Sequence, residues 1–102
     1  MRKLNASEAT IELGALPDWT LDHQVKSIRR DYVLANFMQA FAFMTHIAIA
    51  SEKHDHHPEW SNVYNRVSIT WTTHEVDGLS ANDLTLARLC DEVFASFVIA
   101  FN

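Results

Sequence analysis

The sequence has few of the residues that interrupt helices and strands or that cross-link the chain. It has two glycines, two prolines and one cysteine among 102 residues. Long flexible loops are therefore not expected, and the single Cys90 excludes an intramolecular disulfide. A lone cysteine fits a reducing compartment. The N-terminal residues do not form a charged segment followed by an apolar one, so secretion is not indicated. We expect a cytoplasmic protein, with a nuclear location also open.

Long apolar runs and an excess of positive charge are also missing. The longest apolar stretch, Phe41 to Ala50, contains Thr45 and His46 and is too short to span a bilayer. The formal net charge of −5 argues against nonspecific nucleic-acid binding, which requires a basic surface. We therefore expect neither a membrane partner nor direct contact with nucleic acid.

Apolar residues, by contrast, are plentiful. They make up 48% of the chain, as expected for a globular protein. The length suffices for one domain, residues 1–102, with one modest core. No repeat, low-complexity segment or linker divides it.

The first half of the sequence predicts a helix, two strands and a second helix. Asn5 and Glu8 form a capping-box pattern, so a short helix should follow and end near residues 14–17. Residues 19–21 and 27–33 read as short strands joined by a polar turn. Asn36, with Gln39 at the third helical position, should begin a helix that ends near Lys53. Its predicted buried face consists of residues at helical spacing: Phe37, Met38, Phe41, Met44, Thr45 and Ala48.

The second half predicts two strands and a long helix. Pro58 prevents continuation of the helix, and a strand should start near residues 63–64. Strict alternation over residues 67–73 predicts a second strand, with His74 at its end. Ser80 to Asp83 resemble a cap for a final helix lined by Leu86, Leu89, Cys90, Val93, Phe97 and Phe101. The order α-β-β-α-β-β-α favours an α+β domain with an antiparallel sheet and helices on one face.

The final helix carries more apolar residues than one helix face can hold. They are Val93, Phe94, Phe97, Val98, Ile99 and Phe101. One interpretation is a fully buried terminal helix. The other, which we favour, is that the second face forms a subunit interface.

Histidines in two nearby segments suggest acid–base catalysis. His56 and His57 lie in the stretch EKHDHHPEW of residues 52–60, and His74 lies in TTHE. Imidazole exchanges protons near neutral pH, so imidazoles flanked by carboxylates and an indole predict a proton-transfer pocket for a planar substrate. A metal site including His54 is the alternative. We expect no metal, since no thiolate lies nearby and the spacing matches no standard zinc pattern. We also expect no cofactor.

These residues resemble a known family. EKHDHHPEWSNVY, followed by Thr73-His74 and by Gly78-Leu79-Ser80 with Asp83, resembles the pterin-4a-carbinolamine dehydratases. The FAFM stretch, the Pro17-Asp18-Trp19 turn and residues 65–70 extend the resemblance to nearly the whole chain. It implies an α+β fold with a four-stranded antiparallel sheet and three helices. It also implies dehydration of 4a-hydroxytetrahydrobiopterin to quinonoid dihydrobiopterin, which recycles the cofactor of aromatic amino acid hydroxylases.

The resemblance also implies the site residues. It makes His56, His57 and His74 catalytic. We assign His57 and His74 to proton transfer and His56 to binding and polarising the substrate, although the roles could be exchanged. The implied substrate-binding residues are Glu52, Asp55, Pro58, Trp60, Thr72, Thr73, Glu75 and Asp83. Asp83 could instead only cap the last helix, and Trp60 and Trp71 could be core residues.

The resemblance also bears on self-association and on an alternative function. Family members are homodimers or homotetramers, and we expect self-association through the C-terminal helix and the sheet edge. The alternative function is a binding module that stabilises a transcription-factor dimer, but three histidines favour the enzyme. The other reactive side chains have structural interpretations: His54 faces solvent, His46 lies at the surface or core edge, His23 is in a turn and Cys90 packs within a helix.

Overall fold

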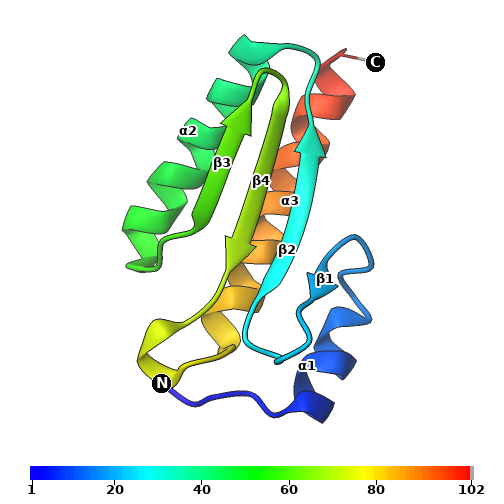
Figure 1. The fold of residues 1–102 in the computed structure, drawn as a ribbon. Coiled ribbons are helices and arrows are strands. Elements are labelled where there is room, and N and C mark those ends of the chain that lie inside the picture. Colours follow the sequence, from blue (N-terminus) through cyan, green and yellow to red (C-terminus); the bar gives the residue numbers. More distant parts are fainter. Residues whose placement is uncertain (102) are drawn as a thin grey trace.

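A computed structural model describes the backbone of residues 1–101 and the side chains of residues 1–97 (Figure 1). Its elements are α1 (Ala6–Leu13), β1 (Thr20–Leu21), β2 (Ile28–Val33), α2 (Phe37–His54), β3 (Glu59–Val63), β4 (Arg66–Trp71), the 3-10 helix η1 (His74–Val76) and α3 (Ala81–Phe101). The predicted α+β class and the order α-β-β-α-β-β-α are confirmed. Within the described residues, no helix is long and apolar enough to cross a membrane.

The four strands form one antiparallel sheet in the order β1-β2-β4-β3. The central strand β4 pairs with β2, from Ile28 opposite Trp71 to Val33 opposite Arg66. On its other side β4 pairs with β3, beginning with Glu59 opposite Thr70. Helices α2 and α3 pack together against one face of the sheet (Figure 1).

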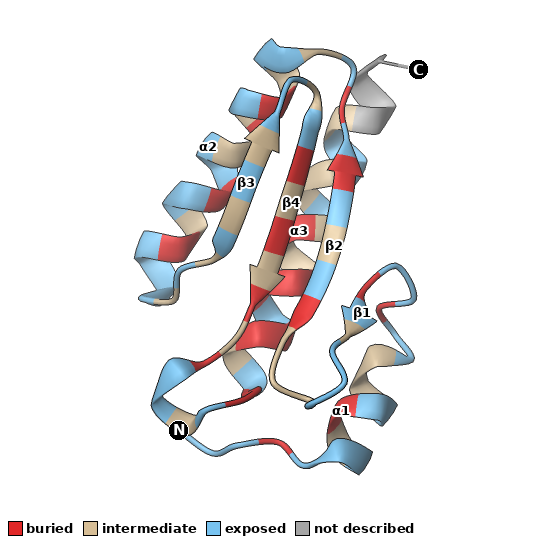
Figure 2. Cartoon of the chain, viewed as in Figure 1, coloured by how far each residue is buried: buried red, intermediate tan, exposed pale blue. Residues whose placement is uncertain are grey.

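The core lies between this sheet and the two long helices (Figure 2). Val67, Ile69 and Trp71 alternate along β4 and are fully buried, as their spacing predicted. The helices contribute other buried apolar residues, among them Ala40, Phe43 and Ile47 of α2 and Leu86, Ala87 and Cys90 of α3. The alternation of buried and less buried side chains therefore fixes which face of β4 meets the helices.

The predicted helix starts are confirmed by hydrogen bonds. Asn5 Oδ1 accepts from the Glu8 amide at 2.9 Å, and Glu8 Oε1 accepts from the Asn5 amide at 3.0 Å, which completes the capping box of α1. Asn36 Oδ1 accepts from the Gln39 amide at 2.9 Å at the start of α2. These side chains satisfy amides that a helix leaves unpaired at its first turn.

A polar cluster centred on Asp91 joins the segment before β1 to α3. Trp19 Nε1 donates to both carboxylate oxygens of Asp91, at 3.1 and 3.2 Å. Arg30 Nη1 lies 2.7 Å from Asp91 Oδ1, and the Tyr32 hydroxyl donates to the same oxygen at 2.5 Å. Burial raises the pKa of the Tyr32 phenol, so it remains a proton donor to this carboxylate.

The predicted buried face of α2 is wrong except at Met44, which is half-buried and packs against the core. Phe37, Met38 and Phe41 are 50%, 67% and 60% exposed, and Thr45 and Ala48 are also exposed. The opposite face is buried instead, through Ala40, Phe43, Ile47 and Ser51. Because α2 carries apolar residues on both sides, its helical periodicity could not identify the side that faces the core.

The predicted strand boundaries in the second half also need correction. β3 begins at Glu59, not near residue 63, and Tyr64 lies in the following turn with φ 50°. β3 is an edge strand with polar Ser61 and Asn62, so it lacks an apolar alternation to mark it. β4 ends at Trp71, and His74 begins η1 instead of ending the strand.

The last helix does not expose its described phenylalanines. Val93, Phe94 and Phe97 are partly buried and pack against the core. The side chains of Val98, Ile99 and Phe101 lie outside the described residues, so the predicted interface on that part of α3 stays a prediction. Within the described part, large exposed apolar side chains instead include Phe37, Met38, Phe41 and Ile49 of α2.

Candidate active site

The two histidine-bearing segments meet at one end of the sheet. Asp55 adopts a left-handed conformation (φ 49°, ψ 46°) and ends α2, while the His56 amide donates to the Ser51 carbonyl at 3.0 Å. This left-handed cap turns the chain back toward β3. The β4–η1 segment leaves the sheet at the same end (Figure 1). His56 and His57 thus lie on one side of this junction and His74 on the other.

His56 forms the most enclosed contact of the site. Its side chain is 11% exposed, and its Nε2 lies 2.6 Å from Oδ1 of the fully buried Asp83. Asp83 Oδ2 accepts from the Thr73 hydroxyl at 2.7 Å and from the Ser80 amide at 2.9 Å. Three donors therefore compensate the burial of this carboxylate.

This pairing has a consequence for the imidazole of His56. With the Asp83 carboxylate accepting at Nε2, the neutral ring carries its proton on Nε2 and a lone pair on Nδ1. Asp83 lies in the first turn of α3, and its carboxylate also accepts from the amide of Ser80, which immediately precedes the helix. Asp83 therefore caps α3, as considered from the sequence, and also contacts a histidine, which the sequence did not indicate. Its predicted contact with the substrate stays a prediction.

His57 points away from the core and pairs with a different carboxylate. Its side chain is 56% exposed, and its Nε2 lies 2.5 Å from Glu52 Oε2. Adjacent residues on an extended chain project to opposite sides. The buried His56 and the exposed His57 therefore present their rings in different environments, and water screens the Glu52 pair.

His74 is the most exposed of the three. Its side chain is 81% exposed, and its Nε2 lies 3.9 Å from Glu59 Oε2. Glu59 is the first residue of β3, only two positions after His57. Each of the three histidines thus has one carboxylate partner, with burial decreasing from His56 through His57 to His74.

The two threonines use their hydroxyls inside the protein. Thr72 Oγ1 donates to the Lys26 carbonyl at 2.6 Å, and the buried Thr73 hydroxyl bonds to Asp83 and Ser80. Thr73 also bridges to Gly78 through its backbone amide at 2.7 Å. Their side chains therefore shape the loop that carries His74.

The other predicted site residues border this junction at different depths. Asp55 and Glu75 are exposed, and Pro58 is half-buried. Trp60 is half-buried and packs against the core. Outside the site, His54 and His23 are exposed, while His46 lies at the surface with its ring 5.7 Å from that of Phe97.

Sequence reasoning missed three contributors to this site. Glu59 pairs with His74, Ser80 bonds to Asp83 and Thr73, and the Trp71 ring stacks on His56. Glu59 could have been suspected from its place in the HHPEW stretch. Ser80 and Trp71 could not, because their sequence patterns indicate only a cap and a core position.

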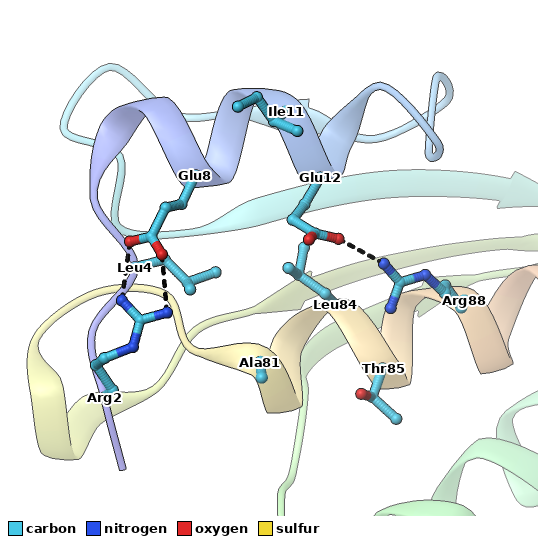
Figure 3. A pocket seen from close by; sticks show the side chains of 9 residues that line it. All are labelled: Arg2, Leu4, Glu8, Ile11, Glu12, Ala81, Leu84, Thr85 and Arg88. Carbon is cyan, nitrogen blue, oxygen red and sulfur yellow. Dashed lines mark hydrogen bonds and ion pairs between the residues drawn. The ribbon is translucent and has the colours of Figure 1, made fainter.

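A separate cavity lies between α1 and α3 (Figure 3). It has a volume of about 350 Å³ and is bordered by two ion pairs, Arg2–Glu8 and Arg88–Glu12, each at 2.8 Å. None of the three candidate histidines lines it. Nor do the described residues contain a group of three His, Cys, Asp or Glu side chains that could hold a metal ion.

Comparison with known proteins identifies the family of this chain. The family model described as pterin 4 alpha carbinolamine dehydratase matches residues 2–93, which include every candidate residue above. The chain belongs to the pterin-4-alpha-carbinolamine dehydratase family. The family resemblance seen in the sequence is therefore confirmed.

Relatives of this dehydratase family match most of the chain. One from Mesorhizobium japonicum, named as a candidate pterin-4-alpha-carbinolamine dehydratase, is 47% identical over 90% of this chain and 94% of its own. A Rhizorhabdus wittichii protein with the same name is 51% identical over 83% and 88%. A crystal structure from Brucella melitensis, described as a transcriptional coactivator/pterin dehydratase, gives a TM-score of 0.87 at 38% identity and covers 90% of this chain and 98% of that chain.

Proposed function

We propose that this protein dehydrates 4a-hydroxytetrahydrobiopterin, a pterin-4a-carbinolamine, to quinonoid dihydrobiopterin. The observation that carries the proposal is the set of three histidine–carboxylate pairs at one end of the sheet. The reaction would return the oxidised cofactor of aromatic amino acid hydroxylases to a reducible form.

The reaction requires two proton movements. The C4a–O bond breaks and its oxygen leaves as water after gaining a proton, while N5 loses a proton and the C4a=N5 bond forms. One group must act as acid and another as base, and each is worth roughly 10²- to 10⁴-fold in rate. Imidazoles suit both tasks near neutral pH.

The three histidines divide between these tasks according to their surroundings. His57 and His74 are exposed and can exchange protons with water, which supports their assignment to proton transfer. His56 is held by Asp83 and suits a fixed contact that binds and polarises the substrate. The acid and base roles of His57 and His74 can be interchanged without altering this scheme.

The residues around the histidines would hold the flat pterin ring. Trp60 offers an aromatic wall, and backbone groups of the stretch from Thr72 to Glu75, apart from the Thr73 amide that bonds to Gly78, would meet the polar ring edge. The full proposed substrate-binding set is Glu52, Asp55, Pro58, Trp60, Thr72, Thr73, Glu75 and Asp83. We infer a cytoplasmic location, with a nuclear one if the protein serves as a coactivator.

A spectrophotometric dehydration assay tests this function. The carbinolamine is generated in situ, and quinonoid dihydropterin formation is followed with wild type, His57→Ala and His74→Ala. Wild type should accelerate dehydration, and each variant should lose about 10²-fold or more of that acceleration. His54→Ala is the matched control, because His54 is exposed at the end of α2 and has no role in the scheme.

Two outcomes would contradict the proposal. A well-folded wild type that fails to accelerate dehydration would rule out the activity. Equal losses in His54→Ala and His57→Ala would indicate a nonspecific effect of removing surface histidines rather than acid–base catalysis.

A protein-binding function is the second candidate. The Brucella melitensis relative is described as a coactivator as well as a dehydratase, and α2 exposes Phe37, Met38 and Phe41. Exposed apolar side chains in one area are typical of interaction surfaces. A His56/His57/His74 triple alanine variant that kept the protein's biological role would favour this candidate over the enzyme.

Self-association is part of the proposal. The C-terminal helix and the sheet edge were the expected contacts, and the exposed apolar side chains of α2 support a further contribution from that helix.

A further inference from the structure

We propose that Trp71 is a positioning residue for His56, holding the plane of its imidazole in addition to filling the core. Its kinetic consequence rests on the dehydratase function proposed above. Its structural consequence rests only on the contacts of His56.

Trp71 forms a rigid surface beneath His56. It is the last residue of β4 and is fully buried in the layer between the sheet and the long helices. The indole and imidazole rings are stacked, with centroids 5.6 Å apart and planes inclined by 16°. A centroid separation of this size with nearly parallel planes corresponds to an offset stack.

Asp83 and Trp71 constrain the imidazole of His56 in different ways. Asp83 holds one atom, Nε2, at 2.6 Å, which leaves rotation of the ring about that contact possible. The indole face opposes that rotation because the imidazole would have to tilt into it. Together the two contacts fix both the position of Nε2 and the direction in which Nδ1 points.

The indole is not the side chain that packing alone would favour here. Among the described side chains, Trp71 Nε1 is buried without a hydrogen-bond partner. The indole also interacts with the thiol of Cys90, but a thiol is at best a weak hydrogen-bond acceptor. An unpaired buried donor destabilises a fold, and leucine or phenylalanine would not introduce one. Leucine and phenylalanine, however, lack the broad indole face that Trp71 presents to His56.

Among the residues that the structure describes, the other two histidines have no comparable support. The side chains of His57 and His74 are 56% and 81% exposed, and the structure gives each a single carboxylate contact. Removing the indole should therefore change the behaviour of His56 and leave the other two imidazoles largely unchanged.

The test compares Trp71→Leu and Trp71→Phe with Trp19→Leu. Trp19 is a matched control because it is also a buried tryptophan, but its indole bonds to Asp91, away from the histidines. Two readouts are needed: kcat and KM in the dehydration assay, and the ¹⁵N signals of the His56 ring, which report its tautomer. The NMR readout does not depend on activity.

Trp71→Leu should lower kcat by about tenfold to a hundredfold and change KM less, because a tilted His56 still reaches the substrate but no longer polarises it correctly in the reaction step. Its His56 signals should lose the single Nε2-protonated signature of wild type, and Trp71→Phe should restore part of both losses. Trp19→Leu should leave that signature intact. If Trp71→Leu does not fold, Trp71→Phe against Trp19→Leu decides in the same way.

A folded Trp71 variant with unchanged His56 signals and unchanged kcat would overturn the proposal. An equal change of the His56 signals in Trp19→Leu would also overturn it, because the effect would then be general to core damage. An inactive wild type would instead refute the dehydratase function, while the His56 signals would still decide the positioning role.

Discussion

At the scale of single residues, the central feature is a buried carboxylate with three donors. Asp83 joins His56 of the α2–β3 connection to Thr73 of the segment after β4 and to Ser80 at the start of α3. A site built from separate segments depends on such a shared partner for its alignment. Asp83 therefore links the stability of the fold to the geometry of the site.

Replacing Asp83 with asparagine should affect both properties. The amide retains only one acceptor oxygen for three donors, so we expect a loss of about 1–3 kcal/mol in the free energy of unfolding. His56 would also lose its charged partner, and kcat should fall by about tenfold or more. Urea denaturation and the dehydration assay measure the two effects. Asp77→Asn, at an exposed position, is the control. An Asp83→Asn variant with the same free energy of unfolding and the same kcat as this control would contradict the account.

Cys90 should behave as a structural residue. Burial raises the pKa of its thiol to about 12, so almost no thiolate is present at pH 8. Iodoacetamide should therefore label native protein very slowly and urea-unfolded protein quickly, as measured by mass spectrometry. Stoichiometric labelling of the native protein within minutes would show that Cys90 is accessible and reactive.

The sequence revealed the histidines but not their individual partners. His57 and Glu52 are close in sequence, and their pairing could be suspected because the carboxylate lies about one turn before the histidine. His56 and Asp83 are 27 residues apart, and only the folded chain brings them into contact. Long-range pairs of this kind have no periodic or local signal.

At the scale of elements, the start of α1 depends on charge. Arg2 donates to both oxygens of Glu8, and Glu8 in turn accepts from the Asn5 amide. The Arg2 hydrogen bonds, followed by the Asn5 amide, lower the pKa of the Glu8 carboxyl to about 2. These interactions connect the N-terminal segment to the first helical turn.

The stability that Glu8 contributes should therefore depend on pH. A carboxyl whose pKa is lowered by folding stabilises the native state above its unfolded pKa, near 4.5, and loses that contribution as pH falls toward 2. Glu8→Gln should be less stable than wild type at pH 7, and the difference should disappear near pH 2. Urea titrations at several pH values measure this, and a constant difference across the range would contradict it.

The elements were predicted best where one face alone is apolar. β4 alternates strictly, and its buried side was correctly identified. α2 was located correctly, but its orientation was not, because Phe37 and Phe41 on one side compete with Phe43 and Ile47 on the other. Only contact with the sheet and α3 decides which side is buried.

At the scale of the whole molecule, the chain exposes apolar surface that a monomer would not need. Phe37 and Phe41 lie on α2 with their ring centroids 6.2 Å apart, and Met38 lies between them in sequence. Burying such side chains gives about 25 cal/mol per Å² of apolar surface. Self-association would remove this surface from water.

A charge placed on this surface should weaken self-association. Phe41→Asp should move the protein toward a smaller species in sedimentation velocity experiments, because a carboxylate would have to be desolvated in the contact. Ile11→Asp is the matched control, since Ile11 is an exposed apolar residue on α1. A wild type that sediments as a monomer at all concentrations would remove the idea of self-association.

The measurement that tests the central claim most directly is the pH dependence of kcat/KM for carbinolamine dehydration. Imidazoles titrate in the neutral range, so the profile of wild type should bend between about pH 5 and 8. His57→Ala and His74→Ala should each lose one limb of that profile along with most of the rate. A profile that is flat from pH 5 to 8, or identical in wild type and both variants, would contradict histidine acid–base catalysis at this site.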